Sequence, residues 1–318
     1  MSAPWESVVS VMDIGGTHVS VAHVDLETRS ILPGESARVP LDSDAGAEEF
    51  VATLVGCAAE VPTLIGSRWS IALPGPFDYA RGIAHYEGVG KFDALRGYDL
   101  GAALAARLPG IGPIGFHNDA DAFGAGEWWV GAARGAGRVV GITLGTGVGS
   151  CFLQDGRPLR EGPGIPPEGR INELSYAGRP LEETVSRQAL RRAYAEAVGG
   201  SAAGSATADL AALVDVAEIA QRVRQGERAA AAVFERTYRV LGTVLAPILA
   251  AFEPEILVIG GSIAASWDLI ATPLIAGLAE TGPGRIDRVA VEPARYPAAA
   301  PLLGAAYLAS DPLLASTN

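Results

Sequence analysis

Three glycine-rich segments, with acidic or hydroxyl side chains beside them, are the parts of this sequence suited to chemistry on phosphate. Their members are Asp13, Gly15, Gly16 and Thr17 in the first, Gly145, Thr146 and Gly147 in the second, and Gly260, Gly261 and Ser262 in the third. Because glycine has no Cβ, backbone N–H groups in such turns can approach phosphate oxygens closely. One cluster alone is equally consistent with an ordinary turn. Matching clusters favour a site for the polyphosphate of a nucleotide.

Two aspartates suit the remaining requirements of phosphoryl transfer. Asp13 suits a magnesium ion or its waters, because this ion prefers carboxylate oxygen and keeps much of its hydration. Asp119 follows the apolar run 111–116 and precedes a predicted helix. A positioned carboxylate accepts the proton of an alcohol as its oxygen attacks the γ-phosphate of ATP. Asp119 is therefore the candidate general base, whereas Asn118 and Asp121 are equally well explained as helix caps.

A rigid loop follows the strand-like run 69–72. Its sequence, Leu-Pro-Gly-Pro-Phe-Asp at 73–78, contains two prolines that fix the backbone and one glycine that relaxes it. Gly75 and Pro76 either form a purely structural turn or line a substrate pocket.

Short β-branched runs precede each glycine turn, so sheets must position the chemistry. Two hairpins of the same design are predicted, one from 8–12 and 18–24 and the other from 138–144 and 150–153. A strand at 255–259 leads through the third turn into a helix at 265–278. Apolar periodicity predicts further helices at 45–61, 120–133, 181–198, 209–224, 227–253 and 301–309. The pattern indicates an α/β fold with a duplicated unit.

Size and composition narrow the class of protein. A chain of 318 residues with 49% hydrophobic side chains predicts about two domains with large cores. A net charge of -12 without a run of Lys or Arg argues against nucleic acid as a partner. The apolar run 240–252 is shorter than the roughly 20 residues of a membrane helix, so we expect a cytoplasmic protein without a membrane partner. Cys57 and Cys151 stand far apart and predict neither a disulfide nor a zinc site.

Five motifs together resemble one family. They are DIGGT at 13–17, LPGPFD at 73–78, NDADAFGAGE at 118–127, LGTGVGS at 144–150 and IGGS at 259–262. Their order is similar to that of the ROK family of sugar kinases, which belongs to a superfamily with Hsp70 and actin. The resemblance spans nearly the whole chain.

The resemblance implies a two-domain, actin-like ATPase (ribonuclease H-like) α/β fold with an interdomain cleft. We expect a small domain from 1–117 with 297–318 and a larger helical domain at 118–296. ATP phosphates are expected at the first two glycine turns and the nucleoside at the third, with ATP and Mg²⁺ as cofactors. Asn118 and Asp119 are expected to contact the sugar, and Asp119 falls on the family's catalytic aspartate.

The sequence departs from the family at the sugar and zinc motifs. Family members carry an ExGH segment and a CxCGxxGCxE zinc motif, whereas residues 172–183 here contain neither cysteine nor histidine, so we expect no zinc. Glu173 is expected to take the place of the sugar-binding glutamate and Glu182 that of the glutamate that closes the zinc motif, both as substrate-binding residues, with Tyr176 near the place of the histidine. Alternatively, this segment is a solvated loop that leads into a helix. Lys91 lies in a Gly-Lys-Phe stretch where the family often has Asn-Leu.

The expected activity is ATP- and magnesium-dependent phosphorylation of a hydroxyl of a small sugar, a hexose or an amino sugar, with Asp119 as general base. Two alternatives stay open: a kinase for a cyclitol or another sugar-like polyol, and a non-enzymatic, sugar-responsive regulator of the same fold. Family members often form homodimers, and residues 128–130 offer either core packing or a subunit contact.

Overall fold

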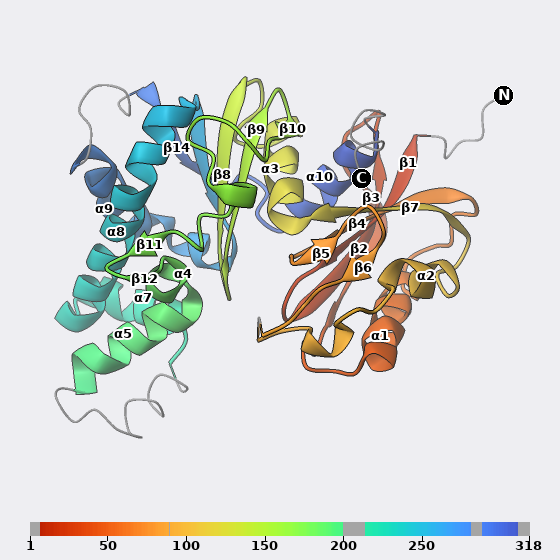
Figure 1. The fold of residues 1–318 in the computed structure, drawn as a ribbon, viewed down its shortest axis with the longest axis horizontal. Helices are drawn as coiled ribbons and strands as arrows, with labels where there is room; N and C mark the ends of the chain where they lie inside the picture. The colour runs from red at the N-terminus through yellow and green to blue at the C-terminus, as the bar shows by residue number, and fades with distance from the viewer. Residues whose placement is uncertain (1–6, 89, 200–213, 281–287, 311–318) are drawn as a thin grey trace. The chain divides into compact units, whose positions relative to one another are not determined.

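The computed structural model describes residues 7–88, 90–199, 214–280 and 288–310, and it divides into two compact units (Figure 1). Unit 1 comprises Met1–Arg134 with Ala298–Asn318, and unit 2 comprises Gly135–Pro297. The predicted domain boundary lay at residue 117, whereas the compact units divide after residue 134. Helix α3 (Asp119–Trp129) belongs to unit 1 because it packs against the C-terminal helix α10 (Ala300–Ser310) of the same unit.

Unit 1 is built on a five-stranded sheet with the order β3-β2-β1-β4-β7. Its strands are β1 (Val8–Ile14), β2 (His18–Asp25), β3 (Ser30–Pro40), β4 (Ser67–Leu73) and β7 (Ile111–Asn118). The first three strands pair antiparallel, and β1, β4 and β7 run parallel. The carboxyl ends of β1, β4 and β7 therefore meet at one edge of the sheet.

Both faces of this sheet are covered because alternate residues of β1 and β2 are apolar on either side. Met12 and Ile14 pack in a core with α1 (Ala47–Ala59) and α2 (Leu100–Ala105). Val9 and Val11 have the opposite parity and pack in a core with α3 and α10. Figure 1 shows α1 and α2 on one side of the sheet and α3 and α10 on the other. Short elements complete the unit: β5 (Phe77–Asp78), β6 (Ile83–Ala84) and η1 (Asp93–Leu95).

The tryptophans of the 128–130 segment belong to the core of unit 1. The ring of Trp129 is buried, and the rings of Trp128 and Trp129 lie 5.4 and 5.8 Å from that of Tyr307 in α10.

Unit 2 contains a second five-stranded sheet, with the order β10-β9-β8-β13-β14. Its strands are β8 (Arg138–Leu144), β9 (Val148–Gln154), β10 (Arg157–Pro158), β13 (Ile256–Gly260) and β14 (Ala290–Pro293). Its helices are α4 (Glu182–Val185), α5 (Arg187–Gly199), α7 (Val216–Arg224), α8 (Arg228–Phe252), α9 (Trp267–Glu280), η2 (Pro167–Gly169) and η3 (Ser262–Ser266). The hairpin β11 (Ser175–Tyr176) and β12 (Arg179–Pro180) precedes α4. Apolar residues of β8, β9 and β13 form one core with α5, α7, α8 and α9.

A glycine-lined helix pair supports each unit. A Cβ at Gly126 or Gly304 would overlap backbone atoms of the partner helix in the α3–α10 pair. Gly242 and Gly277 have the same relation in the α8–α9 pair. The backbones of both pairs approach too closely for any side chain at these positions.

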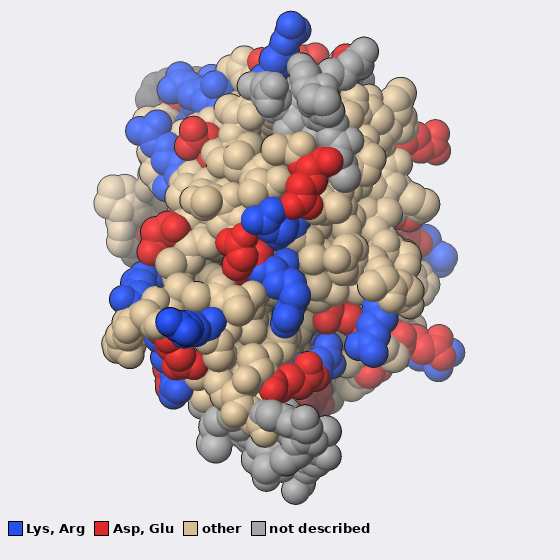
Figure 2. Space-filling model, turned by 90° about the vertical axis from the view of Figure 1, so that its left-hand side faces the viewer, with Lys and Arg blue, Asp and Glu red and all other residues tan. Residues whose placement is uncertain are grey.

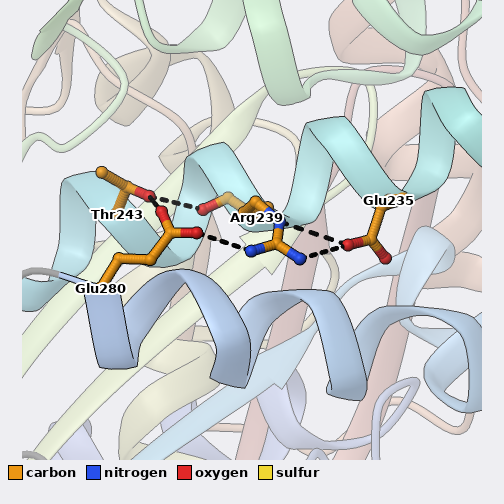
Figure 3. Close-up of polar contacts among 4 residues, drawn as sticks. All are labelled: Glu235, Arg239, Thr243 and Glu280. Carbon is orange, nitrogen blue, oxygen red and sulfur yellow. Dashed lines mark hydrogen bonds and ion pairs between the residues drawn. The ribbon is translucent and has the colours of Figure 1, made fainter.

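Ion pairs link helices on the surface of unit 2. In Figure 3, Arg239 of α8 donates to Glu235 one turn earlier and to Glu280 of α9, at 2.6 and 2.5 Å. The Thr243 hydroxyl also donates to Glu280, at 3.2 Å. On the face that Figure 2 shows, Lys and Arg side chains alternate with Asp and Glu. That surface is therefore mixed in charge.

Most predicted elements are confirmed, with two changes in the helical part. The predicted helix 181–198 is interrupted at Ser186, which separates α4 from α5. Residues 209–213 of another predicted helix lie outside the described residues, and its described part begins at Val216, capped by the Asp215 carboxylate.

One helical stretch among the described residues, Ser262–Glu280, is long and apolar enough to cross a membrane. Its residues Ile270, Leu274 and Leu278 are buried in the core of unit 2.

Candidate functional site

The predicted acceptor residues of unit 1 meet at the carboxyl edge of its sheet. Asp13 in β1 pairs with Ala72 in β4, and the next residue of β4, Leu73, pairs with Asn118 in β7. Neighbouring strands lie about 4.8 Å apart, and β4 lies between β1 and β7. The backbone at Asp13 and the end of β7 are therefore about 10 Å apart across the sheet. The loop after β4, which contains Gly75 and Pro76, begins between them. The sheet thus gathers three segments that are far apart in sequence.

Asn118 caps helix α3, as one of its two interpretations predicted. Its Oδ1 accepts hydrogen bonds from the backbone N–H groups of Ala120 and Asp121, at 3.1 and 3.2 Å. Its Nδ2 donates to the Tyr79 hydroxyl at 3.1 Å, and this hydroxyl donates to the Leu73 carbonyl at 3.2 Å. The cap therefore also ties the start of α3 to the loop after β4.

That loop is anchored on its other side as well. The hydroxyl of Tyr86 donates to the Pro74 carbonyl at 2.6 Å, and the His85 N–H donates to the Pro76 carbonyl at 3.1 Å. The peptide bond between Gly75 and Pro76 is cis. These contacts hold Gly75 and Pro76 at the same edge as Asp13 and Asn118.

Asp119, the first residue of α3, has the electrostatic character of a base. Desolvation by burial raises the pKa of its carboxyl above the ordinary value of 3.8. The ammonium of Lys91 and the backbone N–H of Ala120, which donates to Asp119 Oδ1 at 2.9 Å, lower this pKa in the opposite direction. A carboxylate that binds a proton more tightly than usual is a stronger acceptor for the proton of an alcohol.

Asp13 shows an effect of the same kind. Burial and, to a smaller extent, the neighbouring charge of Asp119 raise the pKa of its carboxyl to about 7, although Arg38 acts in the opposite direction. Because Asp119 raises the pKa of Asp13, the two carboxyls are close enough for their negative charges to oppose each other, and a cation would neutralise that charge. The described residues gather no group of three or more His, Cys, Asp or Glu that could hold a metal. The donors at Asp13 therefore fit a magnesium ion that keeps most of its waters, rather than one enclosed by protein ligands.

Lys91 joins this edge although its sequence motif assigned it no role. A Cβ at Gly16 would lie 3.9 Å from Lys91 Cδ, so the lysine stem runs beside the first glycine turn. Its ammonium acts on Asp119 as described above. The signal that could have revealed it is the replacement of a family Asn-Leu pair by a cationic residue.

Unit 2 gathers its two glycine turns in the same way. Strand β13 runs parallel to β8, with Gly260 opposite Thr143, so the turns that follow both strands meet at one edge. Gly261 has a φ of +83°, and a Cβ there would overlap the backbone of Leu144. The N–H of Gly145 donates to the Gly147 carbonyl at 3.0 Å and closes the turn after β8. Thr146, at the tip of this turn, is exposed.

The two predicted substrate glutamates of unit 2 have different surroundings. A Cβ at Gly147 would lie 2.6 Å from Glu182 Oε1, so Glu182 sits directly against the glycine turn, and its Oε2 accepts from Asn172 Nδ2 at 3.3 Å. Glu173 is 59% exposed and accepts from Arg170 at 3.0 Å. Glu182 therefore lies at the glycine turn, as predicted for a site residue. Glu173 instead forms an exposed ion pair with Arg170.

Comparison with known proteins identifies the family. The model of the ROK family matches residues 9–312. The chain belongs to the ROK family. It is 30% identical to the glucokinase of Thermotoga maritima over 83% of this chain and 84% of the relative. It is 28% identical to the N-acetyl-D-glucosamine kinase of Citrobacter koseri over 93% and 97% of the two chains.

A solved ROK structure shows the fold. The ROK glucokinase of Streptomyces griseus, determined with glucose and AMPPNP, superposes with a TM-score of 0.76 at 24% identity over 95% of this chain and 98% of that one. The expected actin-like ATPase fold is thereby confirmed. Family membership and the named relatives support a sugar kinase.

Proposed function

We propose that this ROK protein transfers the γ-phosphate of ATP to a hydroxyl of a small sugar, with Asp119 as the general base. The observation that carries the proposal is the half-buried carboxyl of Asp119 at the sheet edge, with its pKa raised by desolvation, beside Asn118 and the anchored loop after β4.

The predicted acceptor and magnesium residues of unit 1 each have a role in this reaction. The sugar hydroxyl donates its proton to Asp119 while its oxygen bonds to the γ-phosphorus, and the bond from this phosphorus to the β,γ-bridging oxygen breaks to release ADP. Gly75, Pro76 and Asn118 position the sugar. Asp13 holds the magnesium waters, and the ion supplies charge neutralisation for the phosphates.

The glycine turns bind the donor in this proposal, and Gly15, Gly16 and Thr17 of unit 1 are proposed to contact ATP phosphates. The backbone N–H groups of residues 145–147 and the hydroxyl of Thr146 bind phosphate oxygens, and residues 260–262 lie against the nucleoside. Glu182, against Gly147, and Glu173 are proposed to contact sugar hydroxyls.

A hexose or an amino sugar is the proposed acceptor, because the relatives at 30% and 28% identity are a glucokinase and an N-acetyl-D-glucosamine kinase. A cyclitol kinase or a regulator without turnover are the competing outcomes. We further propose a cytoplasmic protein without bound zinc, whose homodimerisation is open to direct measurement.

The test is ADP release from ATP and magnesium across a panel of hexoses, amino sugars, N-acetyl sugars and cyclitols. The expected result is turnover with one of the sugars that Asp119→Asn abolishes. Turnover with cyclitols alone would replace the acceptor class, and no turnover with any acceptor would favour the regulator. Elemental analysis of the dialysed protein tests for zinc, and light scattering measures the oligomeric state.

A further inference from the structure

Arg187 links the two glycine turns of unit 2. It is the first residue of α5, and its backbone N–H donates to the Gly145 carbonyl at 2.9 Å. Its Nη2 donates to the Ser262 hydroxyl at 3.1 Å. One residue thus contacts both the turn after β8 and the turn after β13. No motif of the sequence points to it.

The guanidinium of Arg187 has unused binding capacity. Its Nε is buried and has no hydrogen-bond partner. Its Nη1 lies 3.6 Å from Asp215 Oδ1, and the two side chains are 36% and 51% exposed. Guanidinium carries five N–H donors in a fixed plane that matches the oxygens of phosphate. A buried donor without an acceptor is costly, so an incoming oxygen at this position would be favourable.

The charge around the turns gives this donor a purpose. The donor residues at 145–147 and 260–262 are uncharged, and Glu182 stands against Gly147. A polyphosphate that approaches the turn after β8 therefore meets the carboxylate of Glu182, which opposes its binding. Arg187 supplies a positive charge in contact with both turns and offsets that repulsion.

We propose that Arg187 is a nucleotide-binding residue whose guanidinium contacts a phosphate oxygen of the donor. The inference rests on the proposed kinase function and adds a charged phosphate ligand to the backbone groups of the glycine turns. It assigns to arginine a share of donor affinity that the glycine motifs alone do not provide.

The experiment is calorimetric titration of the full-length protein with Mg-ADP in the absence of sugar. Arg187→Met keeps the apolar stem and removes the charge, and we expect it to weaken ADP binding by at least about tenfold, as for a charge-assisted hydrogen bond. Arg187→Lys should recover part of the affinity, because a point charge remains without the planar fork. Arg192→Met is the matched control, since Arg192 lies on the same helix and donates to the Glu183 carbonyl. It should bind ADP as the wild type does.

A purely structural link between the turns is distinguished by Asp215→Asn. Asparagine still caps α7, but the carboxylate that competes for the guanidinium is gone. If Arg187 binds phosphate, this variant should bind ADP as tightly as the wild type or more tightly. If Arg187 only holds the two turns together, losing the ion pair with Asp215 should weaken ADP binding, and that result would overturn the proposal.

The remaining outcomes separate the inference from the proposed function. Wild-type affinity in Arg187→Met, while the wild type binds ADP, refutes the role of Arg187 and leaves the kinase intact. Absence of ADP binding by the wild type refutes both. Thermal unfolding without nucleotide accompanies each titration, and an unchanged midpoint in Arg187→Met supports a loss of affinity over a loss of fold.

Discussion

The glycine turns of unit 1 and unit 2 share a backbone design but differ in charge. In unit 1, Asp13 stands two residues before Gly15, and Asp119 lies at the same sheet edge. In unit 2, Thr143 takes the place of Asp13 relative to Gly145, and a guanidinium contacts the turn. Under the proposed function, both turns bind phosphate, unit 1 adds the carboxylates for proton and metal chemistry, and unit 2 adds a positive charge.

The largest effect expected from this division is on turnover. Asp119→Asn should lower kcat by about 10²- to 10⁴-fold, because a general base is lost. Nucleotide affinity should stay within twofold when measured by calorimetry. Asp121→Asn, a neighbouring change in the same helix, serves as the control. Equal loss of ADP binding and turnover in Asp119→Asn would erase the distinction between the units.

The second effect concerns the stability of the unit 2 turns. Gly261→Ala should lower the free energy of unfolding by about 2–4 kcal/mol, because its Cβ would overlap the Leu144 backbone in addition to the strain of a positive φ. Gly135→Ala is matched in φ, at +87°, but has open space around it, so it should cost only about 1–2 kcal/mol. Urea unfolding measures both. Equal losses would show that the close approach of β8 and the third turn adds nothing.

The third effect is a pH dependence confined to unit 1. Because the pKa of Asp13 is about 7 when folded and 3.8 ordinarily, the folded protein binds the extra proton between these values. Stability contributed by Asp13 therefore falls as pH rises from about 4 to about 7, by up to about 1.4 kcal/mol per unit. Asp13→Asn should flatten this slope in urea unfolding with EDTA.

Asp25→Asn provides the opposite control. A hydrogen bond from the Glu27 backbone lowers the pKa of Asp25, so its contribution is present above its ordinary value and lost as pH falls. Removing it should leave the decline between pH 4 and 7 in place. An unchanged slope in Asp13→Asn would contradict the raised pKa of Asp13.

The smallest effect tests Lys91. Its ammonium lowers the pKa of Asp119, so Lys91→Met should move the acidic limb of the kcat/KM profile to higher pH. Lys91→Arg keeps the charge and should leave the limb nearly in place. If both variants shift alike, the effect comes from packing beside Gly16 and not from charge.

The hairpins and the glycine turns could be predicted because their signals are local. Val9 and Val11 pack in one core and Met12 and Ile14 in the other, and the chain turns at Gly15 and Gly16. The helix break at Ser186 was missed because alanine, leucine and arginine around it favour helix. There the Ser186 hydroxyl accepts from the Ala189 N–H at 3.3 Å and starts a new helix.

Long-range contacts account for what the sequence leaves undetermined at the site. The position of Asp119 as a candidate base follows from its motif, but its raised pKa depends on burial and on Lys91, which lies 28 residues earlier. The contact of Arg187 with Ser262 joins residues 75 apart. No local sequence pattern in α5 or in the turn at 260–262 predicts that the two segments are in contact.

The return of α10 to unit 1 has a consequence for synthesis. Leu302, Leu303 and Ala306 complete the core formed by Val9, Val11 and α3, and Gly304 lets the two helix backbones touch. Unit 2 is one contiguous stretch, whereas unit 1 needs this last helix. The ribosome therefore releases every segment of unit 2 before unit 1 can close its second core. The apolar face of α3 that α10 covers therefore stays exposed while the whole of unit 2 is translated.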